Sequence, residues 1–269
     1  MKKIIIYTLL ALTSAVTLIP FIWMLSASLM TDGAASTFPP KFFPSEIVLT
    51  QYETLFTKLS MARNFFNSVF LSIVVTSFSL FFNSMAGYAF AKYRFKGKGK
   101  LFNILLVNMI VPSQVTMLPL FLMLKSVGLI NTYLAIIVTG LANIFGIFLI
   151  RQYCLSIPDS LIEAAKMDGA SDFQIYRKVI LPLAKPILVT LGLFTFLGTW
   201  NDFLWPLIAL TDDSMYTLPV ALSSLMLEHV KDPELMMAGS IITVIPVIVV
   251  FLFLQRYYIK GIVMGSVKE

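Results

Sequence analysis

A polar loop between two long apolar segments carries the stretch EAAKMDGA at residues 163–170, and ILP follows at residues 180–182. Ser160 and Glu163 have the S-x-x-E spacing of a capping box, which predicts that a helix starts at Ser160. Gly169 is expected to end this helix, because the left-handed conformation that often follows a helix suits glycine. At helical spacing, one face carries Leu161, Ala164, Ala165 and Asp168.

A second S-x-x-Q capping box follows at Ser171–Gln174. The spacing predicts a helix with Phe173, Tyr176 and Ile180 on one face, and Pro182 is expected to end it by forcing Leu181 out of helical geometry. Two short helices joined in this way form a rigid unit that can transmit a push. The spacing fits equally an interfacial loop with two amphipathic turns.

The composition indicates an integral membrane protein. The chain is 58% hydrophobic and 13% charged, with mean hydropathy +0.87, whereas a soluble domain carries about 25% charged residues. Cys154 is the single cysteine, so no intrachain disulfide can form. The single histidine, His229, lies in a polar loop and is expected to be solvated.

Six apolar segments are long enough to cross a bilayer, which takes about 20 residues each. Lys2 and Lys3 precede the first, but that segment is too long for a signal peptide and no A-x-A site follows it, so we expect a retained helix. The segments are Ile4–Met30, Asn64–Ala91, Leu101–Leu124, Tyr133–Ile150, Ile187–Leu210 and Met236–Leu254.

The distribution of basic residues predicts the orientation. With the N-terminus inside, 15 of the 20 Lys and Arg residues fall on the cytoplasmic side, chiefly in the loops 92–100 and 151–185, and 5 fall outside. Both termini and the EAA-containing loop are therefore predicted to be cytoplasmic. The net charge of +6 is explained by this asymmetry and does not indicate nucleic-acid binding.

Two predicted spans contain polar residues. Pro112 and Gln114 interrupt the third span, which indicates either a packing kink or a bend that lines a polar path. In the fifth span, Trp200, Asn201 and Asp202 form a polar patch that is either a helix-packing contact or part of a substrate route, since an ionised Asp seldom faces lipid. No combination of residues in the chain is typical of a catalytic or metal site.

The loop at residues 163–170 resembles the EAA loop of ABC importer permeases. Other stretches extend the resemblance from about Asn64 to Lys268, and together they resemble the carbohydrate-uptake branch, specifically the second membrane subunit of maltose-type transporters. These stretches are AGYAFAKYRF (86–95), IVPSQV (110–115), LINTY (129–133), FGIFLIRQ (145–152), WNDFLWPL (200–207), YTLP (216–219) and QRYYIKG (255–261).

This resemblance implies a type I importer permease fold of six transmembrane helices in a bacterial or archaeal inner membrane. It divides the chain into an N-terminal helix with an outer segment (1–63) and a permease domain (64–269) with its EAA loop at about 151–186. It implies a second homologous permease, an extracytoplasmic solute-binding protein, a sugar substrate and an ABC ATPase dimer that carries ATP and Mg; this chain itself is expected to bind no cofactor. The residues expected to couple to the ATPase are Glu163, Ala164, Ala165, Asp168, Gly169 and Ala170, and the tail Gly261–Glu269 is a second expected contact.

The sequence is also compatible with other functions. Within the family, the substrate could be glycerol-3-phosphate or another polyol. A different class is a self-sufficient secondary transporter, although no inverted repeat is evident and only one span is clearly broken. A membrane enzyme is a third class, for which the chain offers no candidate residues.

Overall fold

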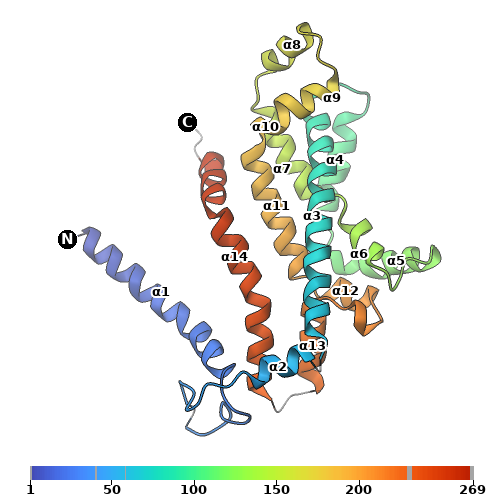
Figure 1. Ribbon diagram of the computed structural model, residues 1–269. Coiled ribbons are helices and arrows are strands. Elements are labelled where there is room, and N and C mark those ends of the chain that lie inside the picture. Colours follow the sequence, from blue (N-terminus) through green and yellow to red (C-terminus); the bar gives the residue numbers. More distant parts are fainter. Residues whose placement is uncertain (1, 40, 58, 229–231, 267–269) are drawn as a thin grey trace. The chain divides into compact units, whose positions relative to one another are not determined.

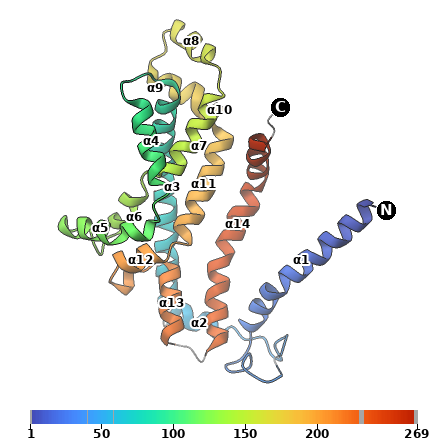
Figure 2. The same cartoon turned by 180° about the vertical axis from the view of Figure 1, so that it is seen from behind.

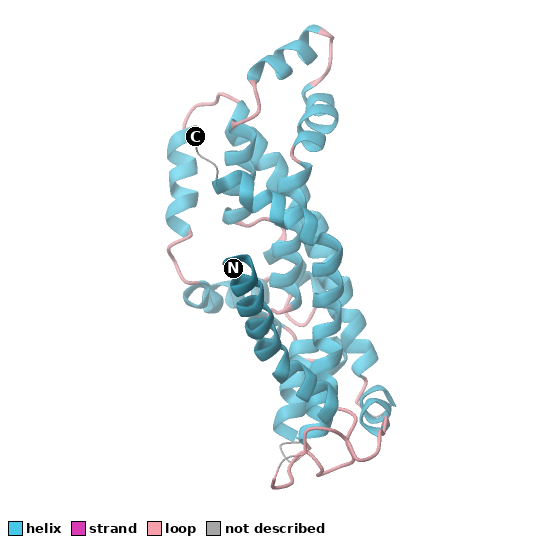
Figure 3. Ribbon diagram, turned by 90° about the vertical axis from the view of Figure 1, so that its left-hand side faces the viewer, coloured by secondary structure: helices cyan, strands magenta, loops and turns pink. Residues whose placement is uncertain are grey.

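A computed structural model describes residues 2–39, 41–57, 59–228 and 232–266, apart from the side chains of 227, 228 and 256–266. Every regular element in this part of the chain is helical, as Figure 3 shows, which confirms the all-α class. The predictions made for His229 and for the contacts of the tail Gly261–Glu269 lie outside the described residues.

The chain divides into two compact units, which we describe separately. The first comprises Met1–Phe66 and Thr217–Ile248. Its helices are α1 (Lys2–Ala27), α2 (Thr50–Thr57), the start of α3 (Met61–Lys92), α13 (Leu218–Glu228) and the first part of α14 (Pro233–Ser266), whose remainder from Val249 belongs to the second unit.

Hydrogen bonds order the outer segment of the first unit. The Ser26 hydroxyl donates to the carbonyl oxygen of Phe42 at 2.6 Å, and the Ser28 and Tyr52 hydroxyls lie 2.8 Å apart. Glu234, at the start of α14, is only 1% exposed and accepts a 2.7 Å hydrogen bond from the backbone N–H of Ala35. The segment that follows α1 is therefore ordered rather than a flexible linker, as its Pro and aromatic content predicts.

The second unit comprises Asn67–Tyr216 and Val249–Glu269. In Figures 1 and 2, the rest of α3 lies beside α7 and α11, and α8 and α9 lie at one end of these helices. Its elements are α4 (Lys98–Asn108), α5 (Ser113–Ser126), α6 (Tyr133–Gly140), α7 (Ile144–Leu155), α8 (Asp159–Met167), α9 (Asp172–Ile175), a π-helical turn η1 (Tyr176–Ile180), α10 (Leu181–Leu183), α11 (Lys185–Trp200), α12 (Leu204–Ala209) and a 3-10 turn η2 (Asp213–Met215).

Four helical stretches are long and apolar enough to cross a membrane, and up to six if each of two bent helix pairs counts as one span. The four single stretches are Lys2–Ala27, Met61–Lys92, Tyr133–Leu155 and Pro233–Gln255. The predicted third span corresponds to one bent pair, whereas the predicted fifth span, Ile187–Leu210, begins after the 80° bend of the other pair, Asp172–Leu183 and Lys185–Trp200. The third is bent by 104° between α4 and α5, where Pro112 cannot continue the hydrogen-bond ladder of α4.

The fourth span contains a break that the sequence did not reveal. Helix α6 ends at Gly140 and α7 begins at Ile144, and Asn83 of α3 accepts a 3.1 Å hydrogen bond from the freed backbone N–H of Asn143. The Asn143 side chain accepts in turn from the N–H of Gly146 at 2.5 Å. These contacts satisfy polar backbone groups that lipid cannot.

Helices α3 and α7 pack closely enough that glycine is required between them. A Cβ on Gly87 would lie 2.7 Å from the Cβ of Ile150, closer than two carbon atoms approach in proteins. One buried core lies at this end of the second unit and joins α3, α7, α11 and the EAA-containing loop. Its buried members are Tyr88, Ala91, Ile150, Cys154, Ile157, Ile162, Ile175, Tyr176, Ile180, Ala184, Ile187 and Leu191.

Candidate functional site: a loop held on a helical frame

Helix α8 carries the EAA stretch, but it does not start as predicted. The helix begins at Asp159 with Pro158 at the N-cap, and no side chain caps it there. Ser160 is thus already inside the helix, and the predicted Ser160–Glu163 capping box is wrong. The reason is that Pro158 sets the helix start: its backbone is extended, with ψ 134°, and the helix begins at the next residue.

The end of α8 has the predicted geometry. Gly169 has φ +78°, in the left-handed region. Its N–H donates to the carbonyl oxygen of Lys166 and the N–H of Ala170 donates to that of Ala165, both at 3.0 Å. This pair of bonds is a Schellman motif, and the accompanying apolar contact is present because Ala165 and Ala170 both pack against the buried core.

The second capping box is confirmed. Gln174 Oε1 accepts from the N–H of Ser171 at 2.8 Å, and the Ser171 hydroxyl accepts from the N–H of Gln174 at 3.4 Å. The predicted ending of this helix is wrong, because Leu181 keeps helical angles and the chain continues into α11. A π-helical turn before Pro182 accommodates the missing donor, and the bend of 80° falls at Ala184 instead.

Buried side chains fix this segment to the membrane helices. Ile162 of α8 and Ile175 of α9 enter the core. The Tyr176 and Ser84 hydroxyls lie 2.6 Å apart, and the Tyr176 ring stacks on Tyr88 of α3 at a centroid distance of 5.9 Å. Phe173 was predicted to share the face of Tyr176 and Ile180, but it is 58% exposed while those two are buried.

Two lysines of the basic loop make specific contacts. The Lys92 ammonium donates to the carbonyl oxygen of Ile157 at 2.5 Å and to Asp159 Oδ1 at 2.6 Å. The Lys98 ammonium donates to the carbonyl oxygens of Ala91, in the last turn of α3, and of Tyr93, just after its end. These lysines therefore satisfy helix ends as well as contributing to the charge asymmetry.

Three large apolar side chains of α8 and α9 are exposed. Leu161 is 44% exposed, Met167 is 84% exposed and Phe173 is 58% exposed. Of the predicted coupling residues, Glu163, Ala164, Asp168 and Gly169 are exposed, while Ala165 and Ala170 are partly buried. We call Leu161, Glu163, Ala164, Met167 and Phe173 the coupling face.

A separate cavity of about 260 Å³, lined by both apolar and polar side chains, lies among α3, α5, α6 and the α11–α12 break. The break leaves Asp202 outside helical geometry, so the prediction that it lies within a helix is wrong. The Asp202 carboxylate accepts hydrogen bonds from the backbone N–H groups of Phe203 and Trp205, at the start of α12. The cavity is lined by Val75, Ser113, Thr116, Met117, Leu120, Ile136, Thr139, Gly140, Thr199, Asp202 and Trp205.

Of the four residues predicted to line a substrate route, only Asp202 lines this cavity. Trp200 is fully buried and stacks on Phe196 at a centroid distance of 6.0 Å. The Asn201 amide donates to the carbonyl oxygen of Leu197 at 2.9 Å. Gln114 is exposed, although its neighbour Ser113 lines the cavity.

Sequence reasoning missed the asparagines that hold the broken helices. Asn131, with φ +59°, accepts from the N–H groups of Thr211 and Asp212 after α12. Asn67 donates to the carbonyl oxygens of Ser214 and Tyr216 and accepts from the Tyr133 hydroxyl. An isolated Asn within an apolar run was the available signal, since such a residue requires partners in a membrane.

The apolar helices, several of them broken, and the ordered loop at one end of α3, α7 and α11 are the features of a polytopic membrane protein. The sequence matches the family of binding-protein-dependent transport system inner membrane components over residues 83–263. The chain belongs to this family. That membership confirms a transport subunit rather than an enzyme, and it argues against a self-sufficient secondary transporter.

Relatives and a solved structure agree with this assignment. The chain is 38% identical to the arabinooligosaccharides transport system permease protein AraQ of Halalkalibacterium halodurans, over 90% of this chain and 86% of AraQ. It is 31% identical to the lactose transport system permease protein LacG of Rhizobium radiobacter, over 100% and 97%. A chain from the crystal structure of a bacterial ABC transporter involved in alginate import matches with TM-score 0.85 and 29% identity, over 95% of this chain and 96% of that one. This likeness confirms the type I ABC permease fold.

Proposed function

We propose that this chain is the membrane subunit of an ATP-driven carbohydrate importer, in which it forms the translocation pathway with a second homologous permease. The names of the relatives AraQ and LacG, which refer to arabinooligosaccharides and lactose, support a sugar substrate. A solute-binding protein delivers the sugar from outside. The bent pair α4–α5 and the helix α11 each cross the membrane once, with α9 and α10 on the cytoplasmic side, which gives six spans with both termini in the cytoplasm.

The coupling face is proposed to dock on a separate ATPase dimer, which holds ATP and Mg. The observation that carries this proposal is the exposure of Leu161, Met167 and Phe173 on a loop that is otherwise fixed to the membrane helices. Large apolar side chains gathered on a polar surface indicate a protein interface. Because the buried core attaches the loop rigidly to α3, α7 and α11, movement of the ATPase would tilt these helices and not only deform the loop.

Paired assays test the docking site. Met167→Asp places a charge on the coupling face, away from the buried core, so the subunit should still insert and assemble with the second permease. We expect sugar uptake in vesicles and binding-protein-stimulated ATP hydrolysis to fall about tenfold or more, the loss expected when a charge is placed in a protein interface. Lys100→Asp, on the exposed first turn of α4, is the matched control. Normal uptake by Met167→Asp would contradict the assignment.

The substrate class has its own test. The cognate solute-binding protein should be stabilised against heat by an oligosaccharide or disaccharide, because a ligand that binds only the folded state raises its melting temperature. Stabilisation by glycerol-3-phosphate or another polyol, and not by sugars, would replace the proposed substrate while leaving the transport class intact.

A further inference from the structure

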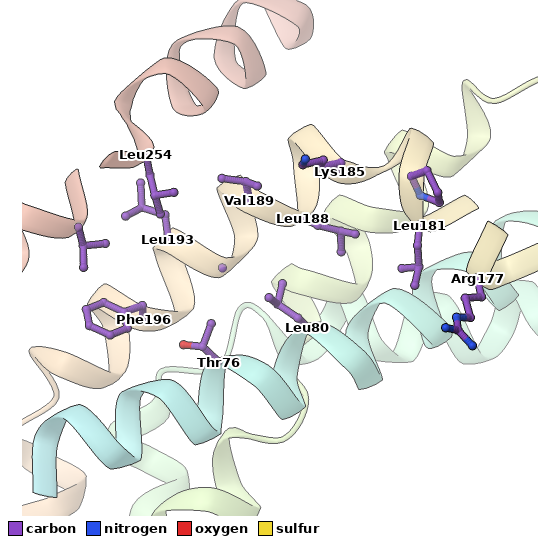
Figure 4. A pocket seen from close by; sticks show the side chains of 13 residues that line it. Thr76, Leu80, Arg177, Leu181, Lys185, Leu188, Val189, Leu193, Phe196 and Leu254 are labelled. Carbon is purple, nitrogen blue, oxygen red and sulfur yellow. The ribbon is translucent and has the colours of Figure 1, made fainter. Parts of the chain in front are cut away.

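An apolar groove lies on the second unit, along one side of α11. Its volume is about 620 Å³, within the range of small-molecule sites. Figure 4 shows α11 along the groove, with Leu80 of α3 on one side and Leu254 of α14 on the other. The lining residues are Thr76, Leu80, Arg177, Leu181, Pro182, Lys185, Leu188, Val189, Gly192, Leu193, Phe196, Val250 and Leu254.

The charges of this groove are gathered at one end. Arg177 and Lys185 line the end where α11 begins, and Phe196 lines the far end (Figure 4). Both cations are exposed, and neither forms an ion pair with any residue that the structure describes. The lining contains no acidic side chain. The groove therefore has two positive charges without acidic partners at one end and an apolar remainder, which we call the trough.

The length of the trough matches one leaflet of a bilayer. From Lys185 to Phe196 helix α11 advances eleven residues, which at about 1.5 Å per residue is about 16 Å. Half of a hydrocarbon core of about 30 Å is about 15 Å. A transmembrane helix of a partner would need an apolar surface through both leaflets, whereas an acyl chain needs one. Gly192 keeps the trough open, since a Cβ there would lie 3.3 Å from Leu80 Cδ1.

We propose that this groove binds an anionic phospholipid of the cytoplasmic leaflet, with its phosphate between Arg177 and Lys185 and one acyl chain along Leu188, Val189 and Leu193. The choice of leaflet rests on the orientation given under Proposed function. Paired basic residues at the cytoplasmic end of membrane helices attract anionic head groups. A free phosphate ion would satisfy the cations but would leave the apolar trough unoccupied.

Helix α10 and the π-helical turn connect the groove to the coupling segment. Arg177 lies in η1, one residue from Tyr176, whose side chain is buried in the core. A phospholipid in the groove would therefore bridge this turn and the first turns of α11 across the 80° bend. The lipid stabilises the bend and, with it, the position of the coupling face.

The binding measurement uses the purified permease–ATPase complex, stripped of lipid and then exchanged with detergent micelles containing phosphatidylglycerol or phosphatidylcholine. Native mass spectrometry counts the phospholipids that remain bound. Wild-type protein should retain phosphatidylglycerol in preference to phosphatidylcholine, and inorganic phosphate should not displace it. Arg177→Gln combined with Lys185→Gln should weaken phosphatidylglycerol binding roughly tenfold or more, the size expected for losing two cations near the membrane surface.

Two further variants separate charge from shape. Lys178→Gln removes an adjacent exposed charge that does not line the groove, so it should leave lipid retention unchanged. Val189→Trp fills the trough while keeping both cations, so it should lower retention of phosphatidylglycerol. Lipid retention is measured without transport, so its outcome is independent of which substrate the complex carries.

Three results would overturn the proposal. The first is equal retention of both lipids by the wild type, and the second is a loss in Lys178→Gln as large as in the double variant. The third is efficient cross-linking of Val189→Cys, in a Cys154→Ala background, to the second permease in a complex that retains no lipid. That last result would assign the groove to a subunit interface.

Discussion

The ammonium group of Lys92 lies 2.6 Å from Oδ1 of Asp159, so the last residue of α3 is tied to the first residue of α8. The Lys92 side chain is only 8% exposed, while that of Asp159 is 75% exposed. The same ammonium donates to the carbonyl oxygen of Ile157. One buried cation thus connects the end of a membrane-spanning helix to the start of the EAA-bearing helix.

Lys92→Met should weaken this connection without changing the apolar core. The substitution keeps a long side chain but leaves the Ile157 carbonyl without its charged donor, a loss of about 1–3 kcal/mol for a buried acceptor. We expect normal membrane insertion and a several-fold drop in sugar uptake. Lys96→Met is the matched control, because Lys96 is exposed in the same loop and has the same effect on net charge. Equal uptake by the two variants would contradict the structural role of Lys92.

The pH dependence of this connection has a definite sign. The Lys92 ammonium, by hydrogen bonding and by its charge, holds the pKa of Asp159 below its ordinary value of 3.8. A carboxyl whose pKa is lowered by folding stabilises the folded state above its unfolded pKa, and this contribution disappears as the pH falls through the folded pKa. A nitroxide label on Ala164→Cys, without Cys154, should therefore keep its mobility between about pH 7 and pH 4 and gain mobility only below that range.

Asp159→Asn provides the comparison for the pH experiment. Asn keeps the size of the side chain but cannot ionise, so the label on this variant should be more mobile at neutral pH. Its mobility should then be insensitive to acid over the range in which the Asp159 form changes. A wild-type transition near pH 5 or above would show that another group controls the loop.

Gly169 allows a test of backbone conformation without steric conflict. No atom lies within 4 Å of a Cβ added there, so the cost of substitution comes from its φ of +78°. Gly169→Ala should cost about 1 kcal/mol, and Gly169→Val more, since β-branched residues rarely adopt positive φ. We expect Gly169→Val to insert normally and to lose at least about tenfold in uptake, with ATP hydrolysis reduced or uncoupled from transport.

Gly99→Val is the control for this experiment. A Cβ on Gly99 also meets no atom within 4 Å, but Gly99 lies within α4 and does not have a positive φ. Its cost is limited to the modest helix propensity of valine. If the two valine variants transport equally well, the left-handed end of α8 is not needed for coupling.

The features that the sequence predicted correctly have local causes. The positive φ of Gly169 and the capping box at Ser171 depend on residues within one helical turn. The incorrect predictions concern places where local signals compete. Pro158 rather than Ser160 sets the start of α8, and a π-helical turn carries the chain past Pro182.

Non-local contacts account for what the sequence could not reveal. The break between α6 and α7 depends on Asn83, sixty positions before Asn143 in the chain. The role of Lys92 depends on a carbonyl group of residue 157, which no side-chain pattern encodes. The polar residues 200–202 correctly indicated where the fifth span is interrupted. They did not show that α11 ends at Trp200, and this helix end explains why Asp202 lines the cavity and Trp200 does not.

Close packing between α3 and α7 predicts an assembly defect rather than a coupling defect. Gly87→Ala places a methyl group 2.7 Å from the Cβ of Ile150 and 3.0 Å from the backbone nitrogen of Arg151, neither of which can rotate away. Overpacking of this kind costs about 1–3 kcal/mol. We expect a lower amount of assembled complex, with a normal transport rate per complex that remains. Gly198→Ala, which meets no atom within 4 Å, should leave the amount unchanged.

The last prediction concerns the cavity beside the α11–α12 break and depends on the difference between Asp202 and Asn201. Asp202 lines the cavity and accepts from the backbone N–H groups of Phe203 and Trp205. Asp202→Asn keeps an oxygen that can accept these bonds, so the α11–α12 break should persist, but it removes the charge offered to a sugar hydroxyl. A hydrogen bond to a charged group contributes about 1.5–3 kcal/mol, so the KM for uptake should rise roughly tenfold or more at unchanged subunit abundance.

Asn201→Ala is the control and should change KM little, because the Asn201 amide bonds to Leu197 and does not line the cavity. A loss of assembled complex in Asp202→Asn with unchanged KM would instead show that Asp202 serves helix packing, and an effect confined to Asn201→Ala would place the substrate route on the other side of α11.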